Sequence, residues 1–184
     1  MTLLALTLAV PAVDTVRSES DLLAALGRLL PSLLTYTMSF LTAGIFWVGQ
    51  QTQLSLLERT DRYLTWIHLG FLLAVTLLPF STQLLAHFIE LRVALIVYWL
   101  NCVMLGGMLF FGATYGLAKG YFRGTEDQQR LAVGLMRRRV YFAEGLYAAA
   151  VALCVINTYV SITLIVLVQL NYIIAPQIPV LRRL

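Results

Sequence analysis

Residues 93–118 read VALIVYWLNCVMLGGMLFFGATYGLA, a long stretch in which no side chain carries a charge. A helix needs about 20 apolar residues to cross the roughly 30 Å hydrocarbon core of a bilayer, so this stretch is long enough for one crossing. Its glycines Gly106, Gly107 and Gly112 indicate that another helix approaches it closely. The stretch therefore predicts a membrane-spanning helix that packs against a neighbouring helix.

Further apolar stretches lie on both sides of it, at Met1–Val13, Pro31–Val48, Tyr63–Leu85 and Val140–Ala175. The last would reach about 54 Å as one helix, so we expect it to break at the polar residues Asn157–Tyr159. The chain then holds about six spans and has no room for a second domain. We expect an all-α polytopic membrane protein that forms a single domain over residues 1–184.

The composition excludes most other classes of protein. Hydrophobic residues make up 60% of the chain and charged residues 12%, and the mean hydropathy is +0.82. Soluble domains carry about 25% charged residues, and about half of that charge cannot cover the surface of a water-soluble globule. A soluble enzyme domain, a nucleic-acid-binding domain and a disordered tail are therefore excluded.

The beginning of the chain has two interpretations. Met1–Val13 would reach only about 20 Å as a helix, and it starts at full hydrophobicity. It is either a signal peptide, although no basic segment precedes it, or a transmembrane helix whose first part is missing from this chain. After it, we expect Ser20 to cap a short helix over Asp21–Leu30, followed by Pro31, that either lies in the membrane interface or begins the next span.

Basic residues predict the orientation in the membrane. Of the 13 Lys and Arg residues, all but Arg17, Arg28 and Arg92 fall after the second, fourth and sixth apolar stretches. Basic residues concentrate on the cytoplasmic side of membrane proteins. Both termini and the polar loop Lys119–Arg139 are therefore expected in the cytoplasm.

Few ionisable residues lie within the expected spans, and such residues are candidates for function. We expect His68 to form an interhelical hydrogen bond and Glu144 to form an ion pair with the basic cluster at Arg137–Arg139. Cys102 and Cys154 lie in apolar stretches and are expected to be buried free thiols. No set of catalytic residues, cofactor motif or metal-ligand spacing is present in the sequence, so we expect neither an enzyme nor a bound cofactor.

The segment Gly112–Gly116, with sequence GATYG, is similar to the carbonyl filter of ordinary potassium channels. Such a filter needs a re-entrant loop behind a short pore helix. This segment instead lies near the inner end of a continuous apolar span, so we interpret its small residues as helix-packing positions.

Four short motifs carry a family resemblance: YTMSF at 36–40, FWVGQQ at 46–51, WIHLGFLL at 66–73 and LLPFST at 77–82. Together they resemble the bacterial branch of the transmembrane-protein-175 family of potassium channels. Gln50 and Gln51 stand where that family usually has histidines, and His68 stands where it usually has asparagine. The resemblance implies a polar network between helices, made here by Trp47, Gln50, Gln51 and His68.

The resemblance also implies a homotetramer in the plasma membrane, the inner membrane of a bacterial cell, with a central pore lined by the first helix. The family's hydrophobic constriction carries over to Leu3 and Leu6, and its threonine layer to Thr2. Spacings of three and four residues allow one helical face to hold all three. The family's pore isoleucine would fall before Met1, so we expect the natural chain to begin earlier.

The expected function is that of a potassium-permeable channel subunit that conducts ions passively. Its partners would be further copies of itself, the lipid bilayer and monovalent cations, with no nucleic acid and no metal beyond the permeating K⁺. A secondary transporter is one alternative, although no inverted repeat or pair of broken helices is evident. A small integral-membrane enzyme or a structural membrane subunit is the other.

Overall fold

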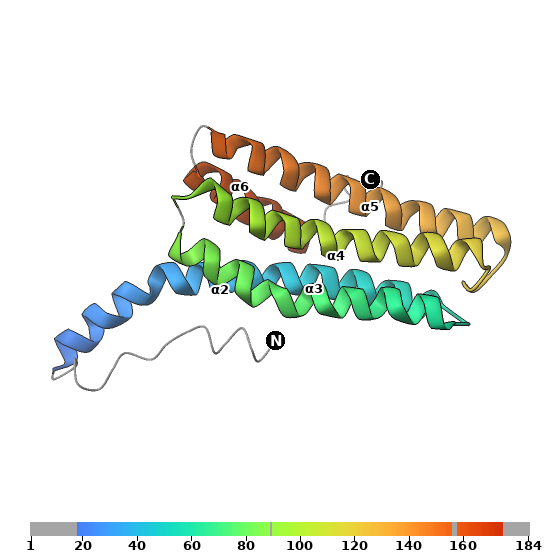
Figure 1. The fold of residues 1–184 in the computed structure, drawn as a ribbon, viewed down its shortest axis with the longest axis horizontal. Coiled ribbons are helices and arrows are strands. Elements are labelled where there is room, and N and C mark those ends of the chain that lie inside the picture. Colours follow the sequence, from blue (N-terminus) through green and yellow to red (C-terminus); the bar gives the residue numbers. More distant parts are fainter. Residues whose placement is uncertain (1–17, 89, 156–157, 175–184) are drawn as a thin grey trace.

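The computed structural model describes residues 18–88, 90–155 and 158–174, and these form a helical bundle (Figure 1). Its elements are the α-helices α2 (Glu19–Leu56), α3 (Arg62–His87), α4 (Arg92–Ala118), α5 (Glu126–Ala152) and α6 (Thr158–Ile174), with a 3₁₀ turn η2 (Leu153–Val155) before the last. Within these ranges no β-strand forms, which agrees with the predicted all-α class. Helices α3 and α4 are each long and apolar enough to cross a membrane.

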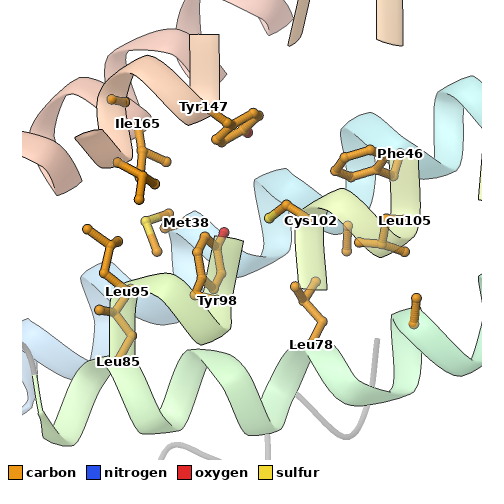
Figure 2. Packing of buried hydrophobic residues seen from close by; sticks show 14 of the residues in the cluster. Met38, Phe46, Leu78, Leu85, Leu95, Tyr98, Cys102, Leu105, Tyr147 and Ile165 are labelled. Atoms are coloured by element: carbon orange, nitrogen blue, oxygen red, sulfur yellow. The ribbon is translucent and has the colours of Figure 1, made fainter. Parts of the chain in front are cut away.

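Helix α4 lies at the centre of the bundle, where it packs against α2, α3 and α5, while α6 packs against α2 and α5. The core residues come from all five helices (Figure 2), and Leu95, Tyr98, Cys102 and Leu105 of α4 are fully buried among them. Cys102 and Cys154 are both buried free thiols, as predicted. Many large apolar side chains instead face outward from the subunit, as expected for a surface that meets lipid or other subunits.

Helix α2 differs from the prediction at its first half. Ser18, not Ser20, is the N-cap, and its Oγ accepts a hydrogen bond from the backbone N–H of Asp21 at 3.2 Å. The helix then runs without interruption through position 31 to Leu56, so Asp21–Leu30 begins the next span and is not a separate interfacial helix. Proline is tolerated in membrane helices, because neighbouring helices, Ser or Thr side chains and local backbone adjustments satisfy the backbone groups that it frees. The first part of α2 projects away from the bundle (Figure 1).

The long apolar region at the end of the chain does break into two helices, as predicted. The break begins earlier than expected, because α5 ends at Ala152 and the 3₁₀ turn follows immediately. Thr158, which was placed in the break, is the first residue of α6. A 3₁₀ turn is a common way to tighten the end of an α-helix, and it needs neither Gly nor Pro.

Most of the polar stretch Lys119–Arg139 is helical and not a loop, which corrects the prediction. Helix α5 begins at Glu126 with a capping box, in which the Gln128 side chain accepts from the Thr125 backbone N–H at 3.0 Å. The connection from α4 to α5 is therefore short. Gly120 and Gly124 in it adopt φ angles of 64° and 93°, a region that favours glycine.

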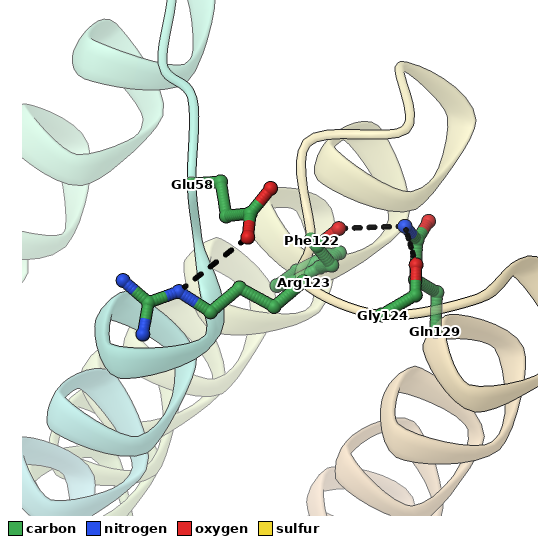
Figure 3. A network of polar contacts seen from close by, with 5 residues as sticks. All are labelled: Glu58, Phe122, Arg123, Gly124 and Gln129. Carbon is green, nitrogen blue, oxygen red and sulfur yellow. Dashed lines mark hydrogen bonds and ion pairs between the residues drawn. The ribbon is translucent and has the colours of Figure 1, made fainter.

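The α2–α3 and α4–α5 connections pair with each other at one end of the bundle (Figure 3). The backbone N–H of Glu58 donates to the carbonyl of Tyr121 at 2.8 Å, and that of Arg123 donates to the carbonyl of Leu56 at 2.9 Å. The Arg123 and Glu58 side chains form an ion pair at 3.8 Å. The two connections therefore lie on the same side, as the distribution of basic residues predicted.

Candidate channel elements

The pore residues expected from the resemblance, Thr2, Leu3 and Leu6, lie outside the described residues, as does the whole of Met1–Val13. The described helices provide the polar groups that lie between and around the apolar side chains of the bundle. Three such groups join helices to one another. Two further features lie at the α4–α5 interface and at the basic end, which is the end of the bundle where the α2–α3 and α4–α5 connections pair.

The first group joins α2 to α3. The Gln50 side-chain N–H donates to Nδ1 of His68 at 2.8 Å, and Gln50 is almost fully buried. The structure therefore brings two of the expected network residues together. It does not bring the other two to them: Trp47 is 46% exposed, Gln51 is exposed, and neither bonds to this pair. Gln50 Oε1 and His68 Nε2 are buried and find no partner within the described ranges.

The second group joins α2, α4 and α6 through a single hydroxyl. Thr42 Oγ1 donates to the carbonyl of Met38 at 2.9 Å and accepts from the Tyr98 hydroxyl and the Gln169 amide, both at 2.6 Å. A hydroxyl has one proton and two lone pairs, so all its hydrogen-bonding capacity is used. Sequence reasoning did not single out this group, although each member is a polar residue within an otherwise apolar span.

The third group joins α3 to both of its neighbours. The hydroxyls of Ser39 and Thr82 lie 2.6 Å apart between α2 and α3, and the Asn101 amide of α4 donates to Ser81 Oγ at 3.0 Å. All four side chains are buried. Short polar side chains of this kind hold membrane helices together, because the lipid offers them no hydrogen bonds.

Glu144 of α5 does not form the expected ion pair with the basic cluster. Both of its carboxylate oxygens are buried and find no hydrogen-bond partner in the part of the chain that the structure describes. The carboxyl instead lies against Gly106 of α4, where an added Cβ would collide with Glu144 Oε1. Arg137, about two helical turns before Glu144, lies over the Phe110 ring with its Cζ 4.8 Å from the ring centroid.

The glycines of α4 match the expected close approaches in part. Gly106 accommodates Glu144, and Gly112 accommodates Gln53, whose Nε2 would lie 2.6 Å from an added Cβ. Among the described residues, an added Cβ at Gly107 would meet nothing within 4 Å, so no helix of the described subunit approaches closely there. The segment Gly112–Gly116 lies in the uninterrupted helix α4, which confirms that it is not a re-entrant filter loop.

Asp61 lies outside the spans and links three elements at the basic end. Its Oδ1 caps α3 by accepting from the backbone N–H of Leu64 at 2.8 Å. Its Oδ2 accepts from the hydroxyls of Tyr115 at 2.6 Å and Tyr121 at 3.1 Å. The Tyr115 hydroxyl and then the Leu64 N–H stabilise the carboxylate, so the pKa of Asp61 lies below its ordinary value of 3.8.

Comparisons with known proteins relate this chain to one family. The family model described as "Endosomal/lysosomal potassium channel TMEM175" matches residues 1–79. The chain is 32% identical over 169 residues to Potassium channel Cha6605_3372 of Chamaesiphon minutus, a match that covers 88% of this chain and 80% of that protein. It is 36% identical over 119 residues to Potassium channel B446_29190 of Streptomyces collinus, covering 62% of this chain and 55% of that protein.

A solved structure agrees with the fold of almost the whole chain. It is the crystal structure of a lysosomal potassium-selective channel TMEM175 homolog from Chamaesiphon minutus, at a TM-score of 0.78 and 26% identity. The match covers 96% of this chain and 89% of that one. The resemblance, the helical membrane fold and the assignment to ion channels and not to enzymes are thus confirmed. This chain belongs to the TMEM175 family of potassium channels.

Proposed function

We propose that this protein is a subunit of a passive, K⁺-permeable channel in which four copies surround a central pore. The observation that carries the proposal is the 32% identity to a potassium channel over 88% of this chain. The agreement in fold with a potassium-selective homolog, at a TM-score of 0.78, supports it. The chain matches 80% of the length of the Chamaesiphon protein but 55% of the Streptomyces protein.

The proposed pore is lined by the first helix, with Leu3 and Leu6 as its constriction. Leucine side chains offer no ligands, so K⁺ would pass with part of its hydration shell. A leucine ring closes when water leaves it and opens when it widens slightly. The Thr2 hydroxyls would then provide the oxygen ligands next to the constriction, and no cofactor is needed for conduction.

The paired hydroxyls of the described bundle favour a pathway between subunits over one inside a single subunit. The Thr42 hydroxyl uses all of its hydrogen-bonding capacity on Tyr98, Gln169 and its own helix. Ser39 and Thr82 likewise bond to each other. Hydroxyls that are paired in this way hold helices together and are not free to bind an ion.

We further propose that the protein lies in the plasma membrane, the bacterial inner membrane, with both termini in the cytoplasm. The pairing of the α2–α3 and α4–α5 connections supports this orientation, because both carry basic residues and lie at one end of the bundle. A membrane-impermeant thiol reagent added outside intact cells should not label a single cysteine introduced at Arg123. Labelling from outside would show that the orientation is opposite to the proposed one.

Flux in liposomes tests the proposed function directly. Purified protein in K⁺-loaded liposomes should release K⁺ down its gradient with no counter-substrate, and native mass spectrometry should give a mass of four chains. Liposomes without protein define the K⁺ release expected without a channel, and a K⁺ ionophore defines complete release. Flux that requires a second solute on the opposite side would favour the transporter alternative, and absence of flux from a four-chain assembly would refute conduction.

A further inference from the structure

The outward face of α5 changes from charged to apolar within one helical turn. Arg138 and Arg139 are exposed, and Tyr141 and Phe142, three to four residues later, are 62% and 55% exposed. Residues at this spacing lie one above the other on a helix. Arginines at the end of an apolar helix extend to the headgroup level of the bilayer. The aromatic residues after them therefore lie at the edge of the hydrocarbon core, next to those headgroups.

These two arginines differ from the other arginines of α5. Arg130 is paired with Glu126 at 2.6 Å, and Arg137 is turned inward over the Phe110 ring. Neither Arg138 nor Arg139 contacts a carboxylate or an aromatic ring anywhere in residues 18–88, 90–155 or 158–174. The face therefore carries two positive charges that the described subunit does not compensate.

The carboxylates at this end of the bundle are already engaged. Glu58 is paired with Arg123, Glu126 with Arg130, and Asp61 accepts from two tyrosine hydroxyls. Of the described carboxylates here, Asp127 is the one left exposed without such a partner, and it precedes Arg138 by about 16 Å along the helix. The described part of a second copy would thus offer little counter-charge to the two arginines, which favours another source for the anion.

The apolar part of the same face is open. An added Cβ at Gly145 would meet no atom of the described residues within 4 Å, Ala149 one turn further is exposed, and Leu146 beside them is 37% exposed. Along the membrane normal the face therefore presents two cations, then two aromatic rings, then a strip of small residues. A phospholipid presents the complementary order, with a phosphate above and acyl chains below.

We propose that this α5 face binds an anionic phospholipid, with its phosphate on Arg138 and Arg139 and an acyl chain along Phe142 and Gly145. Guanidinium groups bind phosphate oxygens in a bidentate manner, which gives this contact geometry as well as charge. An anionic headgroup is required because a zwitterionic one carries its own cation. The proposal depends on membrane insertion and not on conduction, so the two are tested separately.

Lipid titration by native mass spectrometry tests the site. We expect the purified oligomer to bind phosphatidylglycerol roughly 10- to 30-fold more tightly than phosphatidylcholine of the same chains, given two basic residues near the headgroup. The variant R138Q/R139Q should lose this preference. The matched control R123Q/R130Q removes the same number of charges from the same end, but each of those arginines already has a carboxylate partner, so it should keep the preference.

Three results would overturn the proposal. One is an unchanged preference in R138Q/R139Q, and another is an equal loss in both double variants, which would indicate a general effect of net charge. The third is dissociation of the oligomer by R138Q/R139Q with its lipid preference intact, which would make the face a contact between copies. Gly145→Leu gives an independent check, because the subunit has room for the side chain. It should weaken phosphatidylglycerol binding while the oligomer stays intact, and unchanged binding would also contradict the proposal.

Discussion

Replacing Thr42 by valine tests how strongly one hydroxyl holds α2, α4 and α6 together. The substitution keeps the shape of the side chain and removes its oxygen. It leaves the Tyr98 hydroxyl and the Gln169 amide, both in fully buried side chains, without their acceptor. Because lipid cannot replace the lost bonds, we expect the bundle to lose stability.

The magnitude follows from the number of interhelical bonds. Hydrogen bonds between membrane helices contribute about 0.6 kcal/mol on average and about 1.7 kcal/mol at most. Thr42 accepts two of them, so Thr42→Val should cost about 1 to 3 kcal/mol.

Thr37→Val is the matched control on the same helix. Thr37 Oγ1 donates to the carbonyl of Leu33 at 2.8 Å, as Thr42 Oγ1 donates to that of Met38 at 2.9 Å, but Thr37 is exposed. Both variants lose this bond within the helix, so its effect on the free energy of unfolding cancels when the two are compared. Thr37→Val should stay within about 0.5 kcal/mol of the parent protein.

Reversible unfolding of the reconstituted protein, followed by circular dichroism in a denaturant series, would measure both variants. A double-mutant cycle with Tyr98→Phe should give a coupling energy of at least about 0.5 kcal/mol, because the two residues are in direct contact. Equal stability of Thr42→Val and Thr37→Val would refute the reasoning and show that this hydroxyl is not an interhelical link.

Four further predictions concern the pore, the buried acid and the basic end. Leu6→Ala should widen the proposed constriction and raise K⁺ flux from an intact tetramer; a less stable tetramer without more flux would place Leu6 between helices instead. Thr2→Val should shift the reversal potential between K⁺ and Na⁺ toward lower K⁺ preference, and an unchanged potential would assign selectivity to other residues. Glu144→Gln should leave stability within about 0.5 kcal/mol or raise it, because the carboxylate has no ion-pair partner among the described residues; a clear loss in unfolding experiments would contradict this. Asp61 has a lowered pKa, so its carboxylate stabilises the fold above pH 3.8 and this contribution is lost as the pH falls through the lower pKa of the folded state. Asp61→Asn should therefore be less stable than the parent at neutral pH and approach it in acid, and a constant difference across that range would exclude the titration.

Topology could be predicted from the sequence because it depends on sums over many residues. The apolar stretches around Tyr63–Leu85 and Val93–Ala118 correspond to α3 and α4, since length and hydropathy decide whether a segment crosses a bilayer. The positions of basic residues placed the connections after α2 and α4 on one side, and the bond from Glu58 to Tyr121 joins them there.

Particular contacts could not be predicted in this way. Thr42 meets partners that lie 56 and 127 residues away in the chain, and hydropathy shows which residues are polar but not which of them meet. Glu144 was expected to reach its basic neighbours along α5, yet Gly106 of α4 leaves a space that holds the carboxyl. The assignment of Leu3 to the pore came from resemblance alone, because a leucine in an apolar helix gives no local sign of facing a pore.

The paired connections at the basic end also affect the order in which the protein assembles. Glu58 leaves the ribosome well before Tyr121, the residue that its backbone N–H bonds in the finished fold. At about 5 to 20 residues per second, that interval is roughly 3 to 13 s. During this time the connection between α2 and α3 lacks the backbone partner that it has in the finished fold. The bond from Glu58 to Tyr121 can form only when the α2–α3 and α4–α5 connections lie on the same side of the membrane. A second helical pair inserted in the opposite direction would leave Glu58 without this partner.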